Sequence, residues 1–277
     1  MSLEGALKQR PVIQRKRGEQ RKILDNICVE EPLMLQVTGP DKQAQSEPLL
    51  TIMRTPGNDE ALIYGFLYAE GLITSPDDVM AIDAVESDQG EADPNHKSIL
   101  LRNIRANLPA RRFSMTSSCG LCGRLMIDDI ERMLPDRHCD SDISISERML
   151  AQINQDVIQH QGLYQDSGAS HAASLFTASG EFIDVAEDIG RHNAVDKLVG
   201  QALLSQRLPL LDYVLLISGR VSYELMQKAV MAGIQCVVAI GAPSSMALQI
   251  AQRFDMTLIG FLKSESYTVY HGQWRIQ

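Results

Sequence analysis

The strongest constraint on the fold is a regular alternation of apolar runs and amphipathic segments between residues 191 and 261. The apolar runs predict buried strands, and the segments between them carry apolar residues at helical spacing. Such alternation with short loops is typical of a mostly parallel sheet covered by helices in three layers. The predicted elements are a helix at 191–204, a strand at 213–217, a helix at 222–232, a strand at 236–240, a helix at 244–254 and a strand at 256–261.

The chain before residue 191 has a mixed pattern of short strands and isolated helices. Asn58 precedes a predicted helix that ends near Gly71, and Ser146 is the predicted N-cap of a second helix. Turn-forming sequences separate the apolar runs and predict hairpins. The predicted elements are strands at 33–37 and 49–53, a helix from 59 to about 70, strands at 80–85 and 99–104 around a polar loop at 87–97, a helix at 146–160, and strands at 171–177 and 181–185.

These patterns predict an α/β protein with a smaller N-terminal α+β domain. Residues 1–27 hold seven basic and three acidic side chains and are predicted to form a flexible basic arm. Residues 28–142 are predicted to form the small α+β domain, which includes a loop with a cysteine pair. Residues 143–277 are predicted to form the three-layer α/β/α domain.

Composition excludes several classes of protein. The longest apolar stretch, near 213–217, is far shorter than the roughly 20 residues of a membrane span. The N-terminal residues lack the pattern of a secretory signal, so we expect a soluble cytoplasmic protein. A net charge of −9 argues against general binding to nucleic acid. Five irregularly spaced cysteines do not form a disulfide framework, and we expect reduced thiols.

The most specific motif is Ser118-Cys119-Gly120-Leu121-Cys122-Gly123. Two thiols three positions apart, with glycines beside them, can share one exposed turn whose backbone amides favour thiolates. Three uses compete: a redox dithiol, half of a zinc site, and a carrier of sulfur as a persulfide. Two packed, inert thiols are a further alternative.

Metal binding and deamination receive little support. The additional zinc ligands nearest to the pair are His138 and Cys139, and adjacent side chains rarely converge on one tetrahedral metal. We therefore expect no metal site. A zinc deaminase requires His-x-Glu, and His171 is followed by two alanines. A thioredoxin-type motif would begin a helix near the start of the chain, which this pair does not.

Two further motifs could bind an anion. Gly190, Arg191 and His192 precede or begin a predicted helix, where backbone amides and the helix dipole favour phosphate or a thiolate. A network of surface charges is the alternative. Ser218-Gly219-Arg220 follows the strand at 213–217, and ligands of open α/β sheets bind beyond the carboxyl ends of strands. His171 lies beside small residues and is either a ligand-binding or a packed histidine.

Together, these ordered motifs resemble the formate dehydrogenase accessory sulfurtransferase family, or FdhD family. The resemblance spans residues 28 to about 270. It rests on Glu30-Glu31-Pro32-Leu33, Gly65-Phe66-Leu67-Tyr68-Ala69-Glu70-Gly71-Leu72-Ile73, Cys119-Gly120-Leu121-Cys122-Gly123, His171-Ala172-Ala173, Glu187-Asp188-Ile189-Gly190-Arg191-His192-Asn193-Ala194-Val195-Asp196-Lys197, Ser218-Gly219-Arg220 and Gly260-Phe261.

The resemblance implies a cytoplasmic sulfurtransferase that is a homodimer with a cytidine-deaminase-like fold. Its members accept persulfide sulfur from a cysteine desulfurase. They pass the sulfur to the molybdenum or tungsten bis-pterin guanine dinucleotide cofactor of formate dehydrogenase. The alternatives are a chaperone that binds and inserts this cofactor without transferring sulfur, and a dithiol redox protein.

The resemblance also implies roles for individual residues. Cys119 would carry the persulfide and Cys122 would assist it. The family's cofactor-contacting segment corresponds to Phe261, Leu262, Lys263, Ser264, Glu265 and Ser266. Many members have Gly and Arg in place of Glu265 and Ser266, so this chain is expected to bind phosphate weakly there. Ser170 stands where the family commonly has Thr.

Overall fold

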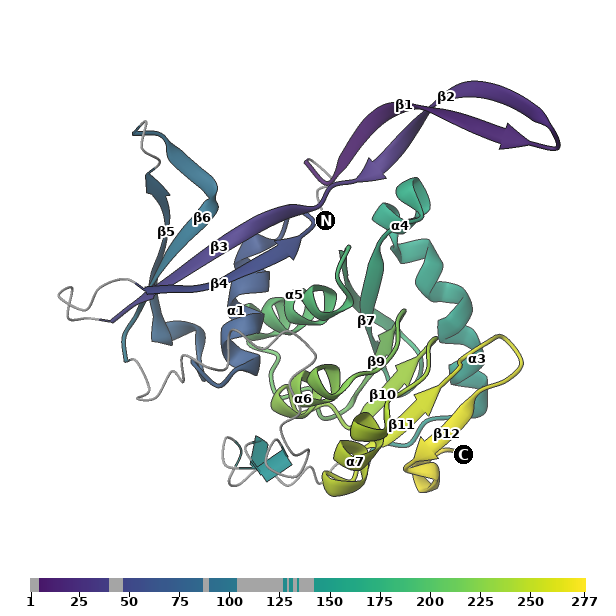
Figure 1. Ribbon diagram of the computed structural model, residues 1–277. Helices are drawn as coiled ribbons and strands as arrows, with labels where there is room; N and C mark the ends of the chain where they lie inside the picture. The colour runs from purple at the N-terminus through teal and green to yellow at the C-terminus, as the bar shows by residue number, and fades with distance from the viewer. Residues whose placement is uncertain are drawn as a thin grey trace.

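A computed structural model describes residues 5–39, 47–86, 90–103, 127–128, 130–131, 134 and 142–277 (Figure 1). Within these residues the strands form three separate sheets. The strands are β1 (Leu7–Lys16), β2 (Glu19–Cys28), β3 (Glu31–Thr38), β4 (Glu47–Arg54), β5 (Val79–Glu86), β6 (Ala92–Leu101), β7 (His171–Thr177), β8 (Phe182–Asp188), β9 (Tyr213–Ile217), β10 (Cys236–Ala239), β11 (Thr257–Gly260) and β12 (Thr268–His271).

The helices connect and cover these sheets. The α-helices are α1 (Asp59–Ala69), α3 (Glu147–Asp156), α4 (Gly162–Ser167), α5 (Arg191–Leu204), α6 (Tyr223–Met231) and α7 (Ser245–Arg253). The described residues also form the short 3-10 helices η1 (Pro76–Asp78), η2 (Val157–His160) and η3 (Gln273–Arg275). None of the helices in the described part of the chain is long and apolar enough to cross a membrane.

The largest sheet has six strands in the order β12-β11-β10-β9-β7-β8. β9, β10 and β11 are parallel, but β7 runs antiparallel to β8 and β9, and β12 runs antiparallel to β11. The strands of the alternating segment are thus parallel, as predicted, whereas β7, β8 and β12 add antiparallel pairs and make the sheet mixed. Helical connections allow parallel neighbours, whereas the direct connections β7–β8 and β11–β12 reverse the direction of the chain.

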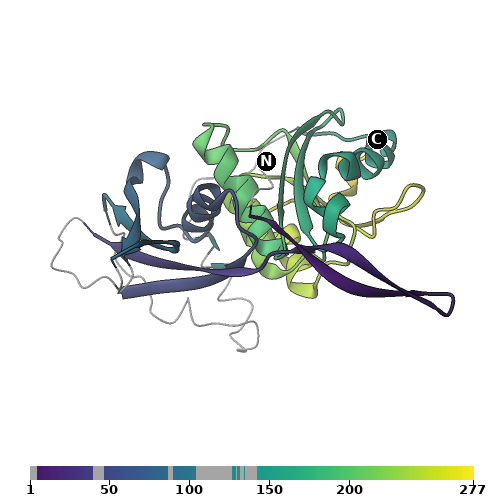
Figure 2. The ribbon, with the colours of Figure 1, turned by 90° about the horizontal axis from the view of Figure 1, so that it is seen from above.

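Apolar side chains alternate between the two faces of this sheet. On β9, Leu215 and Ile217 belong to a core cluster that also contains residues of α5, α6 and α7. Val214 and Leu216 belong to a second cluster, which contains Ile153 of α3. Figure 2 shows α3 and α5 on opposite sides of the sheet. Helices thus cover both faces, and the molecule is of mixed α/β class.

The four-stranded sheet has the order β4-β3-β6-β5. The predicted antiparallel pairing of the strands around residue 40 is confirmed as β3–β4, and β6 pairs with β3 in parallel. β6 begins at Ala92, within the segment predicted as a polar loop. Its first residues pair with β5 alone, and this pairing stabilises a strand that polar composition does not indicate.

The N-terminal segment forms a hairpin instead of the predicted flexible arm. β1 and β2 pair antiparallel over ten residue pairs. Arg17 and Gly18 form the two-residue turn, and both have positive φ angles, as a type I′ hairpin turn requires. High charge suggested disorder, but apolar cross-strand pairs such as Val12 with Ile23 favour the hairpin.

Helices α1 and α5 cross in direct backbone contact and join the two larger sheets. A Cβ atom on Gly65 would overlap the carbonyl oxygen of Asp196, and one on Gly200 would overlap that of Ala61. Glycine at both positions lets the helices approach this closely. The larger core cluster runs through this crossing, from the four-stranded sheet to the helices on the six-stranded sheet.

We expect Gly200→Ala to lower the free energy of unfolding by about 3 kcal/mol or more, because an added methyl group in a filled core forces the backbones apart. Urea unfolding followed by circular dichroism measures the change. Gln201→Ala, one residue along the same helix, is the matched control. Equal stability of the two variants would show that the helices can separate without cost.

Candidate functional site

The candidate site lies where β9 and β10 end and β7 begins. His171 is the first residue of β7 and Ser218 follows β9. The Ser218 hydroxyl accepts a hydrogen bond from the Ala172 amide at 2.9 Å and lies 3.1 Å from Nδ1 of His171. Because the amide occupies its acceptor side, the hydroxyl can donate its proton to an unprotonated Nδ1.

The electrostatic surroundings of His171 favour this neutral form. Burial lowers the pKa of His171, and the positive charges of Arg191 and His192 lower it further. When the His171 ring is neutral, the positive charge of the site is carried by Arg191 and His192. The cluster is therefore suited to an anionic ligand.

Arg191 and His192 are brought to this place by the start of α5. Gly219 allows the close approach, since a Cβ atom there would lie 3.1 Å from Cδ of Arg191 and 3.4 Å from the His171 ring. The Nε atom of Arg191 is buried and has no hydrogen-bond partner among the described residues. A buried donor of this kind normally has a partner, so an anionic ligand atom fits the chemistry of the site.

His192 connects the start of α5 to the start of α6. Its Nε2 atom lies 3.0 Å from the Ser222 hydroxyl and 2.9 Å from a carboxylate oxygen of Glu224. The hydrogen bond from His192 lowers the pKa of Glu224. The sequence does not predict this pairing, because the contact joins the starts of two helices that are distant in sequence.

The backbone at the ends of β9, β10 and β11 is continuous through hydrogen bonds among Gly219, Gly241 and Phe261, and we call this surface the shelf. The Gly241 amide donates to the Gly219 carbonyl, and the Phe261 amide donates to the Gly241 carbonyl, both at 3.2 Å. A Cβ atom on Gly241 would lie 2.7 Å from the carbonyl oxygen of Gly219. β10 separates the loop after β9 from the loop after β11, so the two loops lie about 10 Å apart, or two strand spacings.

The predicted cofactor-contacting residues occupy different environments. Phe261 is 46% exposed at the end of β11, whereas the Leu262 side chain is buried in the core on the α3 side of the sheet. Lys263, Ser264, Glu265 and Ser266 are exposed. They form the β11–β12 turn, in which the Lys263 amide donates to the Ser266 carbonyl at 2.8 Å. Arg220 is exposed beside Gly219.

The predicted sulfur-bearing residues Cys119 and Cys122 lie outside the described residues. Cys28 and Cys236 are free and buried. Burial raises the pKa of Cys28 and raises that of Cys236 to about 12. Both are therefore protonated near neutral pH and poor nucleophiles. Within the described ranges, no group of His, Cys, Asp and Glu side chains could hold a metal ion.

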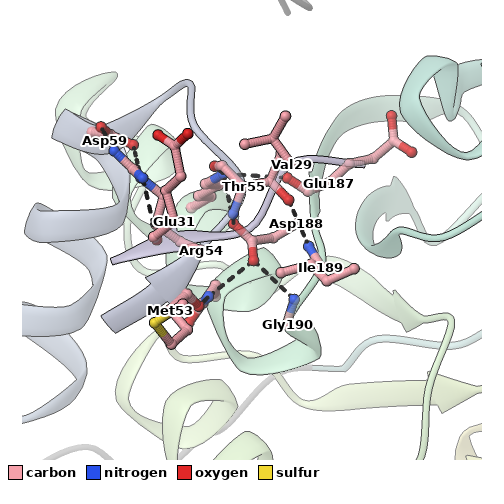
Figure 3. Close-up of polar contacts among 12 residues, drawn as sticks. Val29, Glu31, Met53, Arg54, Thr55, Asp59, Glu187, Asp188, Ile189 and Gly190 are labelled. Carbon is pink, nitrogen blue, oxygen red and sulfur yellow. Dashed lines mark hydrogen bonds and ion pairs between the residues drawn. The ribbon is translucent and has the colours of Figure 1, made fainter. Parts of the chain in front are cut away.

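The motif at 187–197 also contains a buried structural network, which sequence reasoning did not separate from the site (Figure 3). Asp188 and Lys197 are fully buried and form an ion pair at 2.8 Å. One Asp188 oxygen accepts from the Thr55 amide, and the other accepts from Gly190 and Asn193. Lys197 also donates to the Thr55 carbonyl at 2.9 Å. This network holds the start of α5 against the segment after β4.

Polar side chains next to Asp188 and Thr55 add further hydrogen bonds and ion pairs to this buried network. Glu187 accepts hydrogen bonds from the first amides of α4 and from the Ser170 hydroxyl. Arg54, next to Thr55, pairs with Asp59 at 2.8 Å. Asp188 thus binds Lys197 rather than Arg191. The one signal in the sequence for this burial is that the charged residues of the motif at 187–197 are interspersed with apolar residues.

Residues 28–277 match the model of the FdhD/NarQ family. Curated relatives named "Sulfur carrier protein FdhD" include one from Streptomyces avermitilis, 40% identical over 91% of this chain and 89% of the relative. Another, from Saccharolobus solfataricus, is 36% identical over 98% of both chains. One from Nocardia farcinica is 38% identical over 91% of this chain and 88% of its own.

A crystal structure from Desulfotalea psychrophila has a similar fold. It bears the provisional description of a formate dehydrogenase accessory protein. The TM-score is 0.69 at 19% sequence identity, and the alignment covers 98% of this chain and all of the other. The likeness extends over the whole arrangement of sheets and helices.

We expect Lys197→Met to lower the free energy of unfolding by about 3–5 kcal/mol, because it leaves the Asp188 charge buried and unpaired. Denaturant unfolding measures this loss. Arg207→Met is the matched control, since it breaks the partly exposed pair with Asp184 and should cost about 0–1 kcal/mol. A loss no larger than that of the control would contradict a supporting role for the buried pair.

Proposed function

Because the chain belongs to the FdhD/NarQ family, we propose that it is a sulfurtransferase that carries persulfide sulfur from a cysteine desulfurase. The acceptor is the molybdenum or tungsten bis-pterin guanine dinucleotide cofactor of a formate dehydrogenase, which is the substrate of the transfer. The reaction takes place in the cytoplasm, and the fold is the three-layer, cytidine-deaminase-like arrangement of the family.

Sulfur uptake is an exchange reaction between a thiolate and a persulfide. The Cys119 thiolate attacks the outer sulfur of the desulfurase persulfide, a sulfur–sulfur bond forms on Cys119, and the inner sulfur of the desulfurase leaves as a thiolate. Cys122 assists as the neighbouring thiol. The proposal draws support from Cys28 and Cys236, whose burial and raised pKa values make them unsuitable for this step.

The cluster of His171, Arg191 and Ser218 at the strand ends, here called the strand-end site, supports the cofactor-binding part of the proposal. The main observation behind this part is the Nε atom of Arg191, which is buried and has no hydrogen-bond partner among the described residues. Arg191, with His171 and Ser218 beside it, would hold a phosphate of the guanine nucleotide. Gly219 and Gly241 leave the backbone open to close approach. Phe261 offers an exposed ring for the base, about three strand spacings, or roughly 14 Å, from β7.

A chaperone that binds this cofactor and inserts it without transferring sulfur is the alternative. Both functions need the strand-end site, whereas only sulfur transfer needs the thiols. Thiol variants therefore separate the two functions.

We expect Cys119→Ala to abolish sulfur uptake and formate dehydrogenase maturation while GDP binding is retained, because the thiolate is the attacking group. Intact-mass analysis after incubation with a cysteine desulfurase and cysteine detects the added sulfur. Maturation is measured as formate dehydrogenase activity in cells that lack the native gene.

The double variant Cys28→Ala/Cys236→Ala is the control and should still gain one sulfur atom per chain. Full maturation by a folded Cys119→Ala protein would reject the sulfur-carrier role and favour the chaperone. Loss of uptake only in the double variant would assign the carrier to a buried cysteine.

We expect GDP binding to weaken by about 1.5–3 kcal/mol in Arg191→Ala and in Arg220→Ala, the scale of one charged hydrogen bond. Glu265→Gly should tighten binding, and the gain should shrink as salt rises, because it removes a negative charge near an anion. Isothermal titration calorimetry measures each affinity.

Arg148→Ala is the control for these variants, because Arg148 is exposed on α3, at the other face of the sheet. It should leave the GDP affinity unchanged. Unchanged affinity in both Arg191→Ala and Arg220→Ala would place the nucleotide away from the ends of β7 and β9.

A further inference from the structure

His171 and Ser218 form a pair whose geometry limits where the hydrogen of the His171 ring can lie. Two contacts with Ala172 hold Ser218 beside β7. The Ser218 amide donates to the Ala172 carbonyl at 3.0 Å, and the Ser218 hydroxyl accepts from the Ala172 amide at 2.9 Å. The same hydroxyl oxygen lies 3.1 Å from Nδ1 of His171. Ser218 is thus fixed next to one of the two ring nitrogens.

The donors and acceptors around this hydroxyl assign the ring hydrogen to Nε2. The Ala172 amide can only donate, so the hydroxyl oxygen is already an acceptor. Within the described part of the chain, Nδ1 of His171 is the one acceptor to which the hydroxyl can donate. A hydrogen on Nδ1 would take this acceptor away. The favoured arrangement has the Ser218 hydroxyl donating to Nδ1, with the ring hydrogen on Nε2.

The charges around the ring are consistent with a neutral His171. Burial lowers its pKa, and the positive charges of Arg191 and His192 lower it further. Asp188 acts in the opposite direction, but its carboxylate is paired with Lys197 at 2.8 Å. The ring therefore has one hydrogen to donate near neutral pH, and the partner on Nδ1 decides which nitrogen holds it.

The Nε2 atom faces no protein acceptor. It makes no hydrogen bond to any residue that the structure describes, and it is not among the buried unpartnered atoms, so solvent reaches it. A Cβ atom on Gly219 would lie 3.4 Å from Cε1, the ring carbon between the two nitrogens, and 3.1 Å from Cδ of Arg191. The Nε2–H group of His171 and the unpartnered Nε–H group of Arg191 are therefore both close to Gly219.

Two donors beside a bare glycine favour one class of ligand. A phosphate group accepts hydrogen bonds on several oxygens, so it can satisfy both donors at once. An amine or an amide nitrogen would instead bring its own donors against them and leave polar groups unpaired. The pair thus favours an oxyanion over a neutral polar group of similar size.

We propose that Ser218 is a positioning residue that keeps the hydrogen of His171 on Nε2, so that His171 and Arg191 donate together to one phosphate group of the nucleotide. This role rests on the proposed cofactor-binding function of the strand-end site. It gives the two side chains different tasks, because Arg191 supplies positive charge and His171 supplies a neutral donor with a fixed direction.

Nitrogen-15 NMR of the full chain without nucleotide, at about pH 7.5, tests the position of the hydrogen. The His171 signals are identified by their loss in His171→Gln. In the wild-type protein, Nε2 has the chemical shift of a protonated ring nitrogen and Nδ1 that of an unprotonated one. Ser218→Ala increases the share of the ring with its hydrogen on Nδ1. Ser222→Ala is the matched control and leaves His171 unchanged, because that hydroxyl lies 3.0 Å from His192 instead.

Two variants of His171 test the contact with phosphate. Glutamine places an amide nitrogen near the position of Nε2, whereas asparagine is too short to do so. GDP affinity, measured by calorimetry, stays within about threefold of wild type in His171→Gln and falls by about tenfold or more in His171→Asn. Adding GDP to the wild-type protein moves the Nε2 signal, and adding guanosine, which has no phosphate, does not. Circular dichroism verifies that each variant is folded.

Several results would overturn the proposal. A ring hydrogen on Nδ1 in the wild-type protein, or an unchanged ring in folded Ser218→Ala, would reject the positioning role of Ser218. Equal GDP affinity of the two His171 variants, or a Nε2 signal that guanosine moves as far as GDP does, would show that His171 does not donate to the phosphate. A wild-type protein that binds no GDP would instead reject the cofactor-binding function, and the spectra without nucleotide would still decide the role of Ser218.

Discussion

The buried ion pair of Asp188 and Lys197 holds together the segments that position the candidate site. It joins the end of β8 to the first turns of α5, and through Thr55 it ties both to the segment between β4 and α1. Removing two charges from water is costly, and this arrangement offsets the cost because amide groups satisfy the remaining carboxylate positions. The same contacts fix the start of α5, and hence the positions of Arg191 and His192.

The motif at 187–197 thus serves two purposes, one at the buried junction of β8 and α5 and one at the strand ends. Asp188, Asn193 and Lys197 face inward and connect parts of the chain that are distant in sequence. Arg191 and His192 face the strand ends, where their partners are Gly219, Ser222 and Glu224. Residue type alone does not distinguish these roles, because each side contains charged side chains.

The sequence predicted helices and strands well where the spacing of the apolar residues matches the side chains that are buried in the structure. The predicted helix at 191–204 and strand at 213–217 match α5 and β9, and the Ser146 hydroxyl accepts a hydrogen bond from the Met149 amide, as an N-cap does. Pairing partners were harder to predict, since strand direction depends on contacts across the sheet. The polar extension of β6 and the charged β1–β2 hairpin were therefore not predicted from local patterns. Among the candidate site residues, His171, Arg191 and Ser218 lie together, which their separate motifs did not predict, and the Leu262 side chain lies in the core.

The bare backbone at the ends of β9 and β10 has a consequence for selectivity. Gly219 and Gly241 present no side chain with which to distinguish one chemical group from another, and a side chain at Gly241 would collide with the neighbouring strand end. If the proposed nucleotide binds here, discrimination falls to the two ends of the shelf, at Arg191 on one side and at Phe261 on the other. On that proposal, the surface would act as a molecular ruler, which selects a ligand by the separation between its charged group and its aromatic group.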